Sequence, residues 1–211
     1  VQAIGDPRRP ARIGGRQPDD RPFFTAKQTS LSLDWSTALR RVPEFTVTSV
    51  EMTDWAMLVE QGPEGHTFPN LRRPGRTDGG GGGGQRLFTT TVKYLRAWRG
   101  QFAYEDHGAP WGIVAPNIDL YITNEPGYRG GATFHGGTIT IEDYVPMWID
   151  ATSRFTIDGS QLVLDQVDIQ TDGADTIARG TIDMGRWPEQ THAVESRIDF
   201  PRMREIFFAD E

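Results

Sequence analysis

Apolar and polar residues alternate along short segments of this chain, most clearly in its second half. Between Ile118 and Thr123, isoleucine or leucine takes every second position, and Asp119, Tyr121 and Thr123 fill the positions between them. A period of two residues is typical of strands whose sheet has one apolar face. The pattern therefore predicts a protein built mostly from such a sheet, and its function depends on what the apolar face covers.

Turn signals divide the chain into many short strands. Asp158-Gly159 and Asp172-Gly173 stand between alternating segments and predict hairpins, so we expect an all-β, mainly antiparallel meander with one or two short helices. The helices are expected from Asp34 or Ser36 to Leu39, and from Pro201 onward. The expected strands are 29–33, 45–52, 55–60, 87–96, 100–105, 117–123, 131–135, 138–141, 148–157, 161–164, 167–171, 176–183 and 193–200.

The domain organisation is simple. Residues 1–22, rich in Arg, Pro, Gly and Asp, are expected to form an irregular lead-in, and 23–211 one continuous segment. Six consecutive glycines at 79–84 make 72–86 an expected mobile loop, because poly-glycine gains little from packing. A phosphate-binding loop is disfavoured, since the glycines are not followed by Lys-Ser or Lys-Thr.

Composition excludes several classes of function. A net charge of −7 opposes binding to nucleic acid, which needs a clustered basic surface. The chain has no cysteine, so disulfides and thiolate metal sites are excluded. Its sequence holds no apolar run of the roughly 18 to 20 residues that cross a bilayer. We expect the chain to be an interior piece of a longer protein.

Residues with catalytic chemistry form no recognisable motif. Glu105, Asp106 and His107 are adjacent, but neighbours in a strand point to opposite faces, so a polar turn is the favoured interpretation over a metal or acid-base site. The histidines lack the spacing of zinc ligands, and no serine lies in a Gly-x-Ser-x-Gly motif. We expect no catalytic residues, no metal site and no cofactor.

Several segments resemble a known family. The sequence TSVEMTDWAMLVE at 48–60, followed by GHTFPNL at 65–71, is similar to the amino-terminal repeat of the AsmA-like family, which includes the TamB-type envelope proteins. RPFFTAKQTSLSL at 21–33 and WSTALRR at 35–41 resemble its preceding strand and short helix. WRGQFAYED at 98–106 and FTIDGSQLVL at 155–164 are similar to later repeats of the family, and FPRMREI at 200–206 resembles its recurring strand-to-helix step. Unlike the family, the chain has no anchor and carries the 79–84 glycines.

The resemblance implies a long antiparallel sheet curled into an open trough. It also implies periplasmic localisation with an inner-membrane anchor outside this chain, and either phospholipid transfer between inner and outer membranes or help in outer-membrane assembly. The partners would be phospholipid acyl chains and an outer-membrane assembly protein. The apolar alternation is compatible with a lipid groove, for which we expect the lining residues Ile118, Leu120, Ile122, Phe134, Ile139, Ile141, Phe155, Ile157, Leu162 and Leu164.

Two other functions stay open at this point. In a two-sheet carbohydrate-binding or glycan-processing domain, the same apolar residues would form a closed core and exposed tryptophans would stack on sugar. A scaffold that assembles outer-membrane proteins by strand addition would have long unpaired sheet edges.

Overall fold

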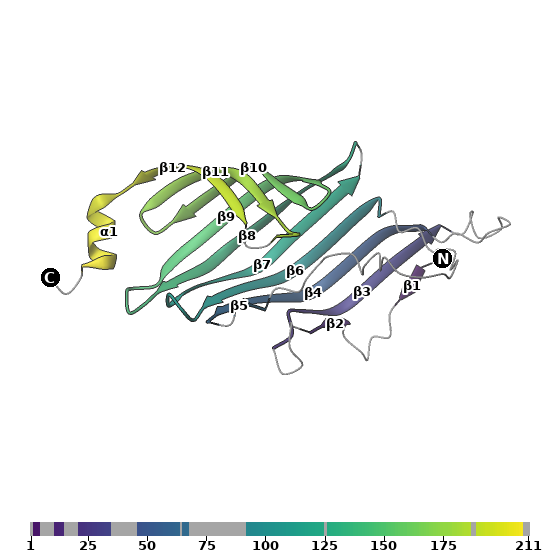
Figure 1. Cartoon of the computed structure of the whole chain (residues 1–211), viewed down its shortest axis with the longest axis horizontal. Helices are drawn as coiled ribbons and strands as arrows, with labels where there is room; N and C mark the ends of the chain where they lie inside the picture. Colours follow the sequence, from purple (N-terminus) through teal and green to yellow (C-terminus); the bar gives the residue numbers. More distant parts are fainter. Residues whose placement is uncertain are drawn as a thin grey trace, which may run out of the picture.

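The computed structural model describes residues 2–4, 11–14, 21–34, 46–63, 65–67, 92–124, 126–186 and 189–208. These residues form twelve strands in one sheet and one short helix (Figure 1). The elements are β1 (Gln2–Ile4), β2 (Ala11–Ile13), β3 (Phe24–Asp34), β4 (Thr46–Gly62), β5 (Gly65–His66), β6 (Tyr94–Asp106), β7 (Trp111–Asn124), β8 (Tyr128–Ile141), β9 (Met147–Asp158), β10 (Gln161–Thr171), β11 (Ala174–Asp183), β12 (Gln190–Ile198) and α1 (Phe200–Phe207).

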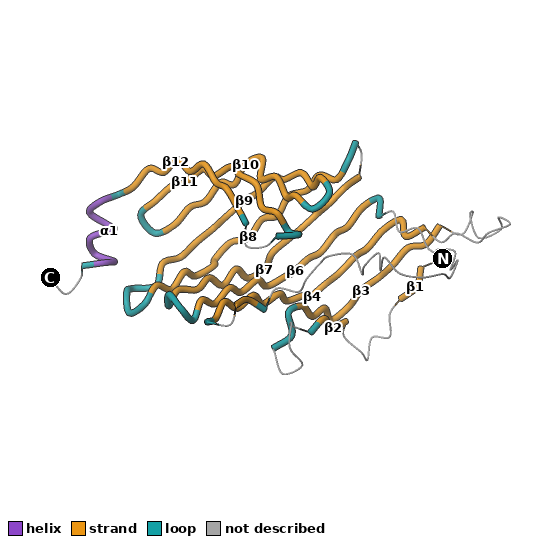
Figure 2. Tube along the Cα trace, in the orientation of Figure 1, coloured by secondary structure: helices purple, strands orange, loops and turns teal. Residues whose placement is uncertain are grey.

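The sheet is elongated, curled and open, as the family resemblance implies. Its strands follow the order β1-β3-β4-β6-β7-β8-β9-β10-β11-β12, with β2 beside β3 and β5 beside β4. Figure 2 shows long strands from β3 to β9 lying diagonally and shorter strands from β10 to β12 crossing them at the upper rim. The sheet does not close into a barrel, so the fold is an all-β open trough.

One pair of strands corrects the expected antiparallel meander. β4 and β6 run parallel, from Ser49 opposite Tyr94 to Gln61 opposite Asp106. A parallel pair needs a crossover of at least about a dozen residues, and the chain between β4 and β6 is much longer than that. The sequence pattern marks strands but not the direction in which neighbours run.

Several pairs of expected strands are single, bulged strands, so those predictions were wrong. The expected breaks at Thr53-Asp54, between 96 and 100 and at Gly136-Gly137 all lie inside continuous strands, β4, β6 and β8. Asp54, Arg99 and Gly136 have φ values of 50°, 50° and 71°. A fourth expected break, between 164 and 167, is a register shift within β10. Asp and Gly favour bulges as well as turns, and a bulge bends a strand without ending it.

The bulges line up across neighbouring strands and surround a buried tryptophan. Asp54 on β4 lies beside Arg99 on β6, and Asn117 on β7, with φ of 51°, continues the line. Trp55, only 6% exposed, packs beside them. Its indole lies over Gly100, where an added Cβ would come within 2.0 Å of Trp55 Cε2. The buried cluster around Trp55 consists of Ala26, Ala97, Ala115 and Ile118.

The turn that follows β11 reaches back to the first strands of the sheet. Met184, at the end of β11, packs against a second buried cluster formed by Phe23 and Val59 near β3 and β4. These residues are far apart in the strand order, so only strong curling of the sheet can bring them into contact.

Helix α1 closes the described part of the chain. Asp199 caps it by accepting a hydrogen bond from the Arg202 amide, and Pro201 lies in its first turn, as predicted. Phe207 contacts Tyr144 in the turn between β8 and β9, with ring centroids 5.0 Å apart. The expected helix through Leu39, most of the lead-in 1–22 and the 72–86 loop lie outside the described residues.

Candidate functional site

The ten expected lining residues all lie on one face of the sheet. Residues paired across neighbouring strands point to the same side, so the register fixes the face. Leu120 is paired with Ala97 and Ala132, Ile122 with Leu95 and Gly130, and Ile113 on the same strand with Ile139. The bulge at Asn117 lets Ala115 and Ile118, three positions apart, share this face. We call it the apolar face.

The same face continues onto β9, β10 and β11. Phe155 is paired with Gly130 and Leu164, and Ile157 with Leu162. Gly130 is needed here because a Cβ at this position would lie 2.7 Å from the Phe155 ring. Leu162 in turn is paired with Ile182 on β11. The apolar face therefore extends without interruption from β4 to β11.

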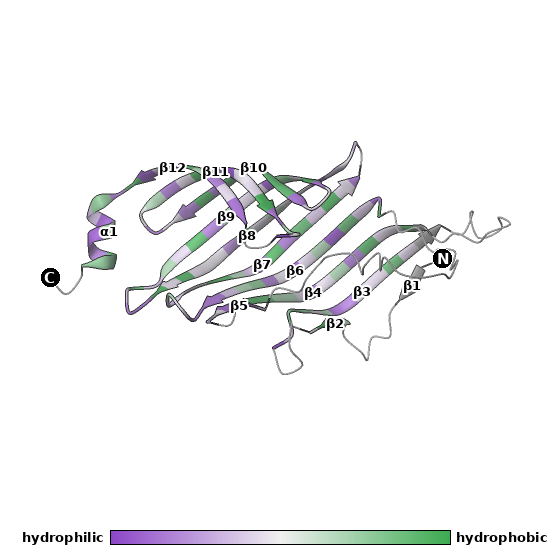
Figure 3. Ribbon diagram, in the orientation of Figure 1, coloured by the Kyte–Doolittle hydropathy of each residue, from purple (hydrophilic) through white to green (hydrophobic). Residues whose placement is uncertain are grey.

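The opposite face is polar. Asp119, Tyr121 and Thr123 point to this side between the aliphatic residues of β7, and Figure 3 shows the alternation of hydrophilic and hydrophobic residues along the strands. A cavity of about 450 Å³ lies on this face, lined by Tyr94, Arg96, Tyr121 and Thr123 together with Leu95 and Ile122. Its lining is mostly polar and aromatic, unlike that of the apolar face.

The lining residues differ in how far they are packed. Ile118 is 7% exposed and belongs to the Trp55 cluster, and Leu120 and Phe134 pack against that cluster. Phe155 is 8% exposed. The other lining residues, Ile122, Ile139, Ile141, Ile157, Leu162 and Leu164, are half-buried and contact neither buried cluster of the described part of the chain. The accessible apolar surface thus lies mainly on β8 to β10.

Sequence reasoning missed part of this face. Val167 and Ile169 lie on it beyond the register shift in β10, paired with Ser153 and Ala151, and Ile182 joins from β11. The spacing of three residues from Leu164 to Val167 is the sign of this shift in the sequence. Trp55, which the alternation of residues does not single out, belongs to the buried cluster on this face.

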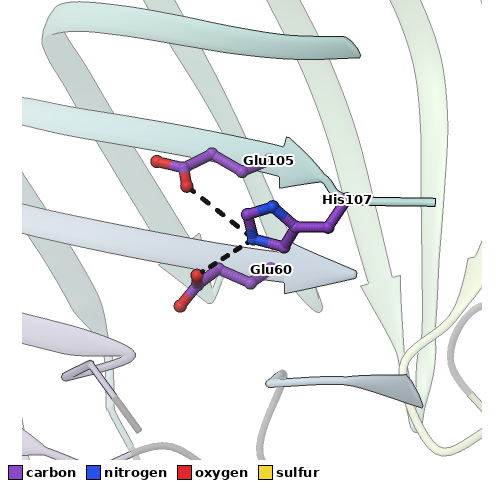
Figure 4. Close-up of side chains that lie close together, drawn as sticks. All are labelled: Glu60, Glu105 and His107. Atoms are coloured by element: carbon purple, nitrogen blue, oxygen red, sulfur yellow. Dashed lines mark hydrogen bonds and ion pairs between the residues drawn. The ribbon is translucent and has the colours of Figure 1, made fainter. Parts of the chain in front are cut away.

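A charged cluster lies at one end of β4 and β6, on the polar face (Figure 4). His107 Nε2 lies 3.3 Å from a carboxylate oxygen of Glu60 and 4.0 Å from one of Glu105. The three ligating atoms lie within 4.8 Å of one another, close enough to consider a metal ion. Sequence spacing could not find this cluster, because Glu60 comes from another strand.

Arg21 forms ion pairs with both carboxylates of this cluster. Its Nη2 lies 2.5 Å from Glu60 and also bonds Glu105. The hydrogen bond from Arg21, and then that from His107, lowers the pKa of Glu60, while both carboxylates raise the pKa of Arg21. A metal ion would have to displace this guanidinium. The expectation of no specific metal site remains a prediction.

Asp106 is directed away from that cluster, as the strand geometry requires. Its Oδ1 accepts hydrogen bonds from the amides of Gly108 and Ala109, at 2.8 and 3.0 Å. These bonds hold its pKa below the ordinary value. The polar-turn interpretation of Asp106 is confirmed, whereas Glu105 and His107 form part of an ion-pair network.

No protein-family model matches the chain, and no curated protein matches it significantly. Among the described residues, no helix has the length and apolar character to cross a bilayer.

Proposed function

We propose that this chain is a non-enzymatic segment of an AsmA-like, TamB-type envelope protein that carries phospholipid between inner and outer membranes. Its apolar face would hold acyl chains, and the protein would act in the periplasm, anchored to the inner membrane by a segment outside this chain. Assistance to outer-membrane assembly is the related role that the same resemblance supports. No catalytic group is required for either.

The observation that carries the proposal is the uninterrupted apolar face of one open sheet. All ten lining residues lie on that face, and six of them are half-buried and outside the buried clusters of the described residues. Contiguous apolar surface that stays accessible to solvent usually serves to bind a partner or ligand. Acyl chains match such a surface, because each buried CH₂ contributes about 0.8 kcal/mol without directional contacts.

The packing favours one section of the face as the lipid site. Trp55 and its cluster fill the face over β4 to β7. Ile157, Leu162 and Leu164 on β9 and β10 are half-buried and have no such filler. Acyl chains should therefore lie against β8 to β10. Leu120 is unsuited to a test, since it packs against the Trp55 cluster and a carboxylate there would destabilise the fold.

Leu162→Asp tests the proposal. Purified wild-type chain should retain phospholipid detectable by mass spectrometry, and Leu162→Asp should retain at least tenfold less, because a carboxylate on this face must be desolvated when acyl chains cover it. Val163→Asp is the matched control, since Val163 is the next residue of the same strand and points to the polar face. Val163→Asp should keep the lipid.

Circular dichroism and thermal unfolding establish that both variants are folded. Equal lipid retention by Leu162→Asp and Val163→Asp, or no lipid on the wild-type chain after exposure to phospholipid vesicles, would refute an apolar lipid groove. The sugar-binding alternative requires a two-sheet sandwich, and all described strands belong to one sheet. Trp111 and Trp148 are exposed, as stacking on sugar would need, but they lie on opposite faces of the sheet and form no shared platform.

A further inference from the structure

In the described part of the chain, strand β12 is the last strand at one edge of the sheet. Among the described residues it pairs with β11 alone, and all nine of its residues are exposed. Val194 and Ile198, on the apolar face, are 63% and 45% exposed. Natural edge strands usually carry a proline, a bulge or charged side chains, lysine above all, that prevent further pairing. β12 has no proline and no lysine, its two charged side chains, Glu195 and Arg197, are of opposite sign, and its register with β11 is regular from end to end.

The backbone of β12 offers hydrogen bonds outward at its even-numbered residues. The Asp199 amide donates to Gly173 O, and the Glu189 carbonyl accepts from the Asp183 amide, so odd-numbered residues face β11. The N–H and C=O of a strand residue point to the same side and alternate along the strand. Val194, Ser196 and Ile198 therefore present both groups to the open edge.

The side chains of β12 are complementary to those of a second, antiparallel copy. A two-fold axis at Ser196 places Val194 opposite Ile198 of the other copy, and Glu195 opposite Arg197. The first pair falls on the apolar face and the second on the polar face, because Val194 and Glu195 are adjacent in the strand. Cross-strand apolar pairs and opposite charges both stabilise pairing.

Helix α1 leaves this edge accessible. Arg202 bonds Asp172 through Nε and Nη2, at 2.8 and 2.6 Å, and Phe207 packs on Tyr144. Both contacts lie on the sheet side of β12, at the β10–β11 and β8–β9 turns. The helix thus turns back over the end of the sheet and away from the open edge (Figure 1).

We propose that a second copy of this chain pairs antiparallel with β12 about Ser196. The axis is perpendicular to the sheet, so both apolar faces lie on the same side and form one longer apolar surface. The inference does not depend on the lipid proposal, since self-association is measured without lipid. A contact through a few residues of one strand buries little surface, so we expect weak pairing with a Kd of about 100 µM.

Cysteine cross-linking tests the register directly, because the chain contains no cysteine. Ser196→Cys places the two thiols opposite each other, and mild oxidation at high protein concentration should give a disulfide-linked dimer. Thr191→Cys is the matched control. It is equally exposed on the same strand, but the proposed pairing separates the two copies of this residue by about 33 Å. It should stay monomeric.

A charge exchange tests the same pairing without a cross-link. Glu195→Arg or Arg197→Glu alone should weaken self-association at least fivefold in sedimentation equilibrium, and the double exchange should restore it. Circular dichroism checks that each variant is folded. A chain that stays monomeric well above 100 µM overturns the proposal and favours a strand from elsewhere as the edge partner. Equal cross-linking at 196 and 191, or association unaffected by the single exchanges, also overturns it.

Discussion

The two halves of the sheet share one apolar face but use it differently. The bulged half, consisting of β3, β4, β6, β7 and β8, has four in-strand residues with positive φ, at Asp54, Arg99, Asn117 and Gly136. The regular half, consisting of β9 to β12, has none within its strands and only one register shift, in β10. The Trp55 cluster lies entirely in the bulged half, and β12 in the regular half is exposed along its whole length.

The difference shows that alternation decides which residues share a face, whereas bulges decide whether the face is filled. Bulges increase twist and bend a strand, and an aligned row of them lets side chains of several strands converge. The small residues Ala97, Gly100 and Ala115 leave room for the Trp55 indole at that bend. On β9 and β10, by contrast, Ile157, Leu162 and Leu164 stay half-buried, although Phe155 beside them is buried.

The largest effect is expected from substitutions at the centre of the bulged half. Gly100→Ala should reduce the free energy of unfolding by about 3 kcal/mol, because its Cβ would overlap the Trp55 ring. Trp55→Ala should cost about 3 to 5 kcal/mol through loss of the buried ring. In the Trp55→Ala background the alanine at 100 should add less than about 1 kcal/mol. Chemical denaturation measures all three.

Two control substitutions test whether the large loss of stability is specific to the Trp55 cluster. Gly62→Ala, at the end of β4, meets no atom closer than 3.9 Å and should change stability little. Leu162→Ala in the regular half should cost less than about 2 kcal/mol, because the side chain is only half-buried. If Leu162→Ala were as costly as Trp55→Ala, the distinction between a filled and an accessible section would be lost.

Lowering the pH should have a smaller effect on stability, through a carboxyl group in the regular half. Asp183, at the end of β11, accepts hydrogen bonds from Arg186 Nε and the Gly185 amide, both at 2.8 Å, and from Ser160. These bonds, that of Arg186 foremost, hold its pKa below the ordinary value of 3.8. A carboxyl group with a lowered native pKa stabilises the fold above its unfolded pKa, and this contribution is lost as pH falls through the native value.

The melting temperature should therefore fall below a pH of about 4, and Asp183→Asn should flatten that fall while lowering the neutral-pH value. Scanning calorimetry from neutral pH to about pH 2.5 measures both. Asp158→Asn, at the exposed β9–β10 turn, is the control and should follow the wild-type profile. If the melting temperature of Asp183→Asn depended on pH as that of the wild-type chain does, the hydrogen bonds of Asp183 would not stabilise the regular half.

The smallest effect is expected for metal binding by the charged cluster of Glu60, Glu105 and His107, at one end of β4 and β6. Zinc titration of the wild-type chain should show no stoichiometric binding, because Arg21 occupies Glu60 and Glu105. Arg21→Ala should free these carboxylates and His107 as ligands and produce one-to-one binding by calorimetry. His107→Ala in that background should remove it. Stoichiometric binding by the wild-type chain would mean that a metal ion, not Arg21, joins these strand ends.

Much of the fold could be predicted from the sequence because a period of two runs along the strands between their bulges. It placed all ten lining residues on one face and the β9–β10 and β10–β11 hairpins at their Asp-Gly turns. The bulges were mistaken for strand ends, although spacings of three, from Met52 to Trp55 and from Ala97 to Gly100, mark a shift of phase. Such a shift in the alternation can mark either the end of a strand or a β-bulge within it. The two cases differ only in whether the neighbouring strand continues to pair beyond the shift.

The remaining features depend on contacts between distant residues. Neither the parallel direction of β4 and β6 nor the meeting of Glu60 with Glu105 and His107 is encoded in local spacing. Both follow from where the chain re-enters the sheet after β5. The curling that brings Met184 to Phe23 and Val59 likewise arises from twist accumulated over many strands.

The parallel pair also has a consequence for the order in which the sheet assembles. From β6 onward each strand pairs with the next one in sequence, so these contacts close short loops and form early. β3 and β4 likewise pair as sequence neighbours. Joining the two pieces requires partners as distant as Ser49 and Tyr94 to meet, and the long intervening segment must be closed first. We therefore expect the β4–β6 seam to form last, with its rate set by the length of the 63–93 connection.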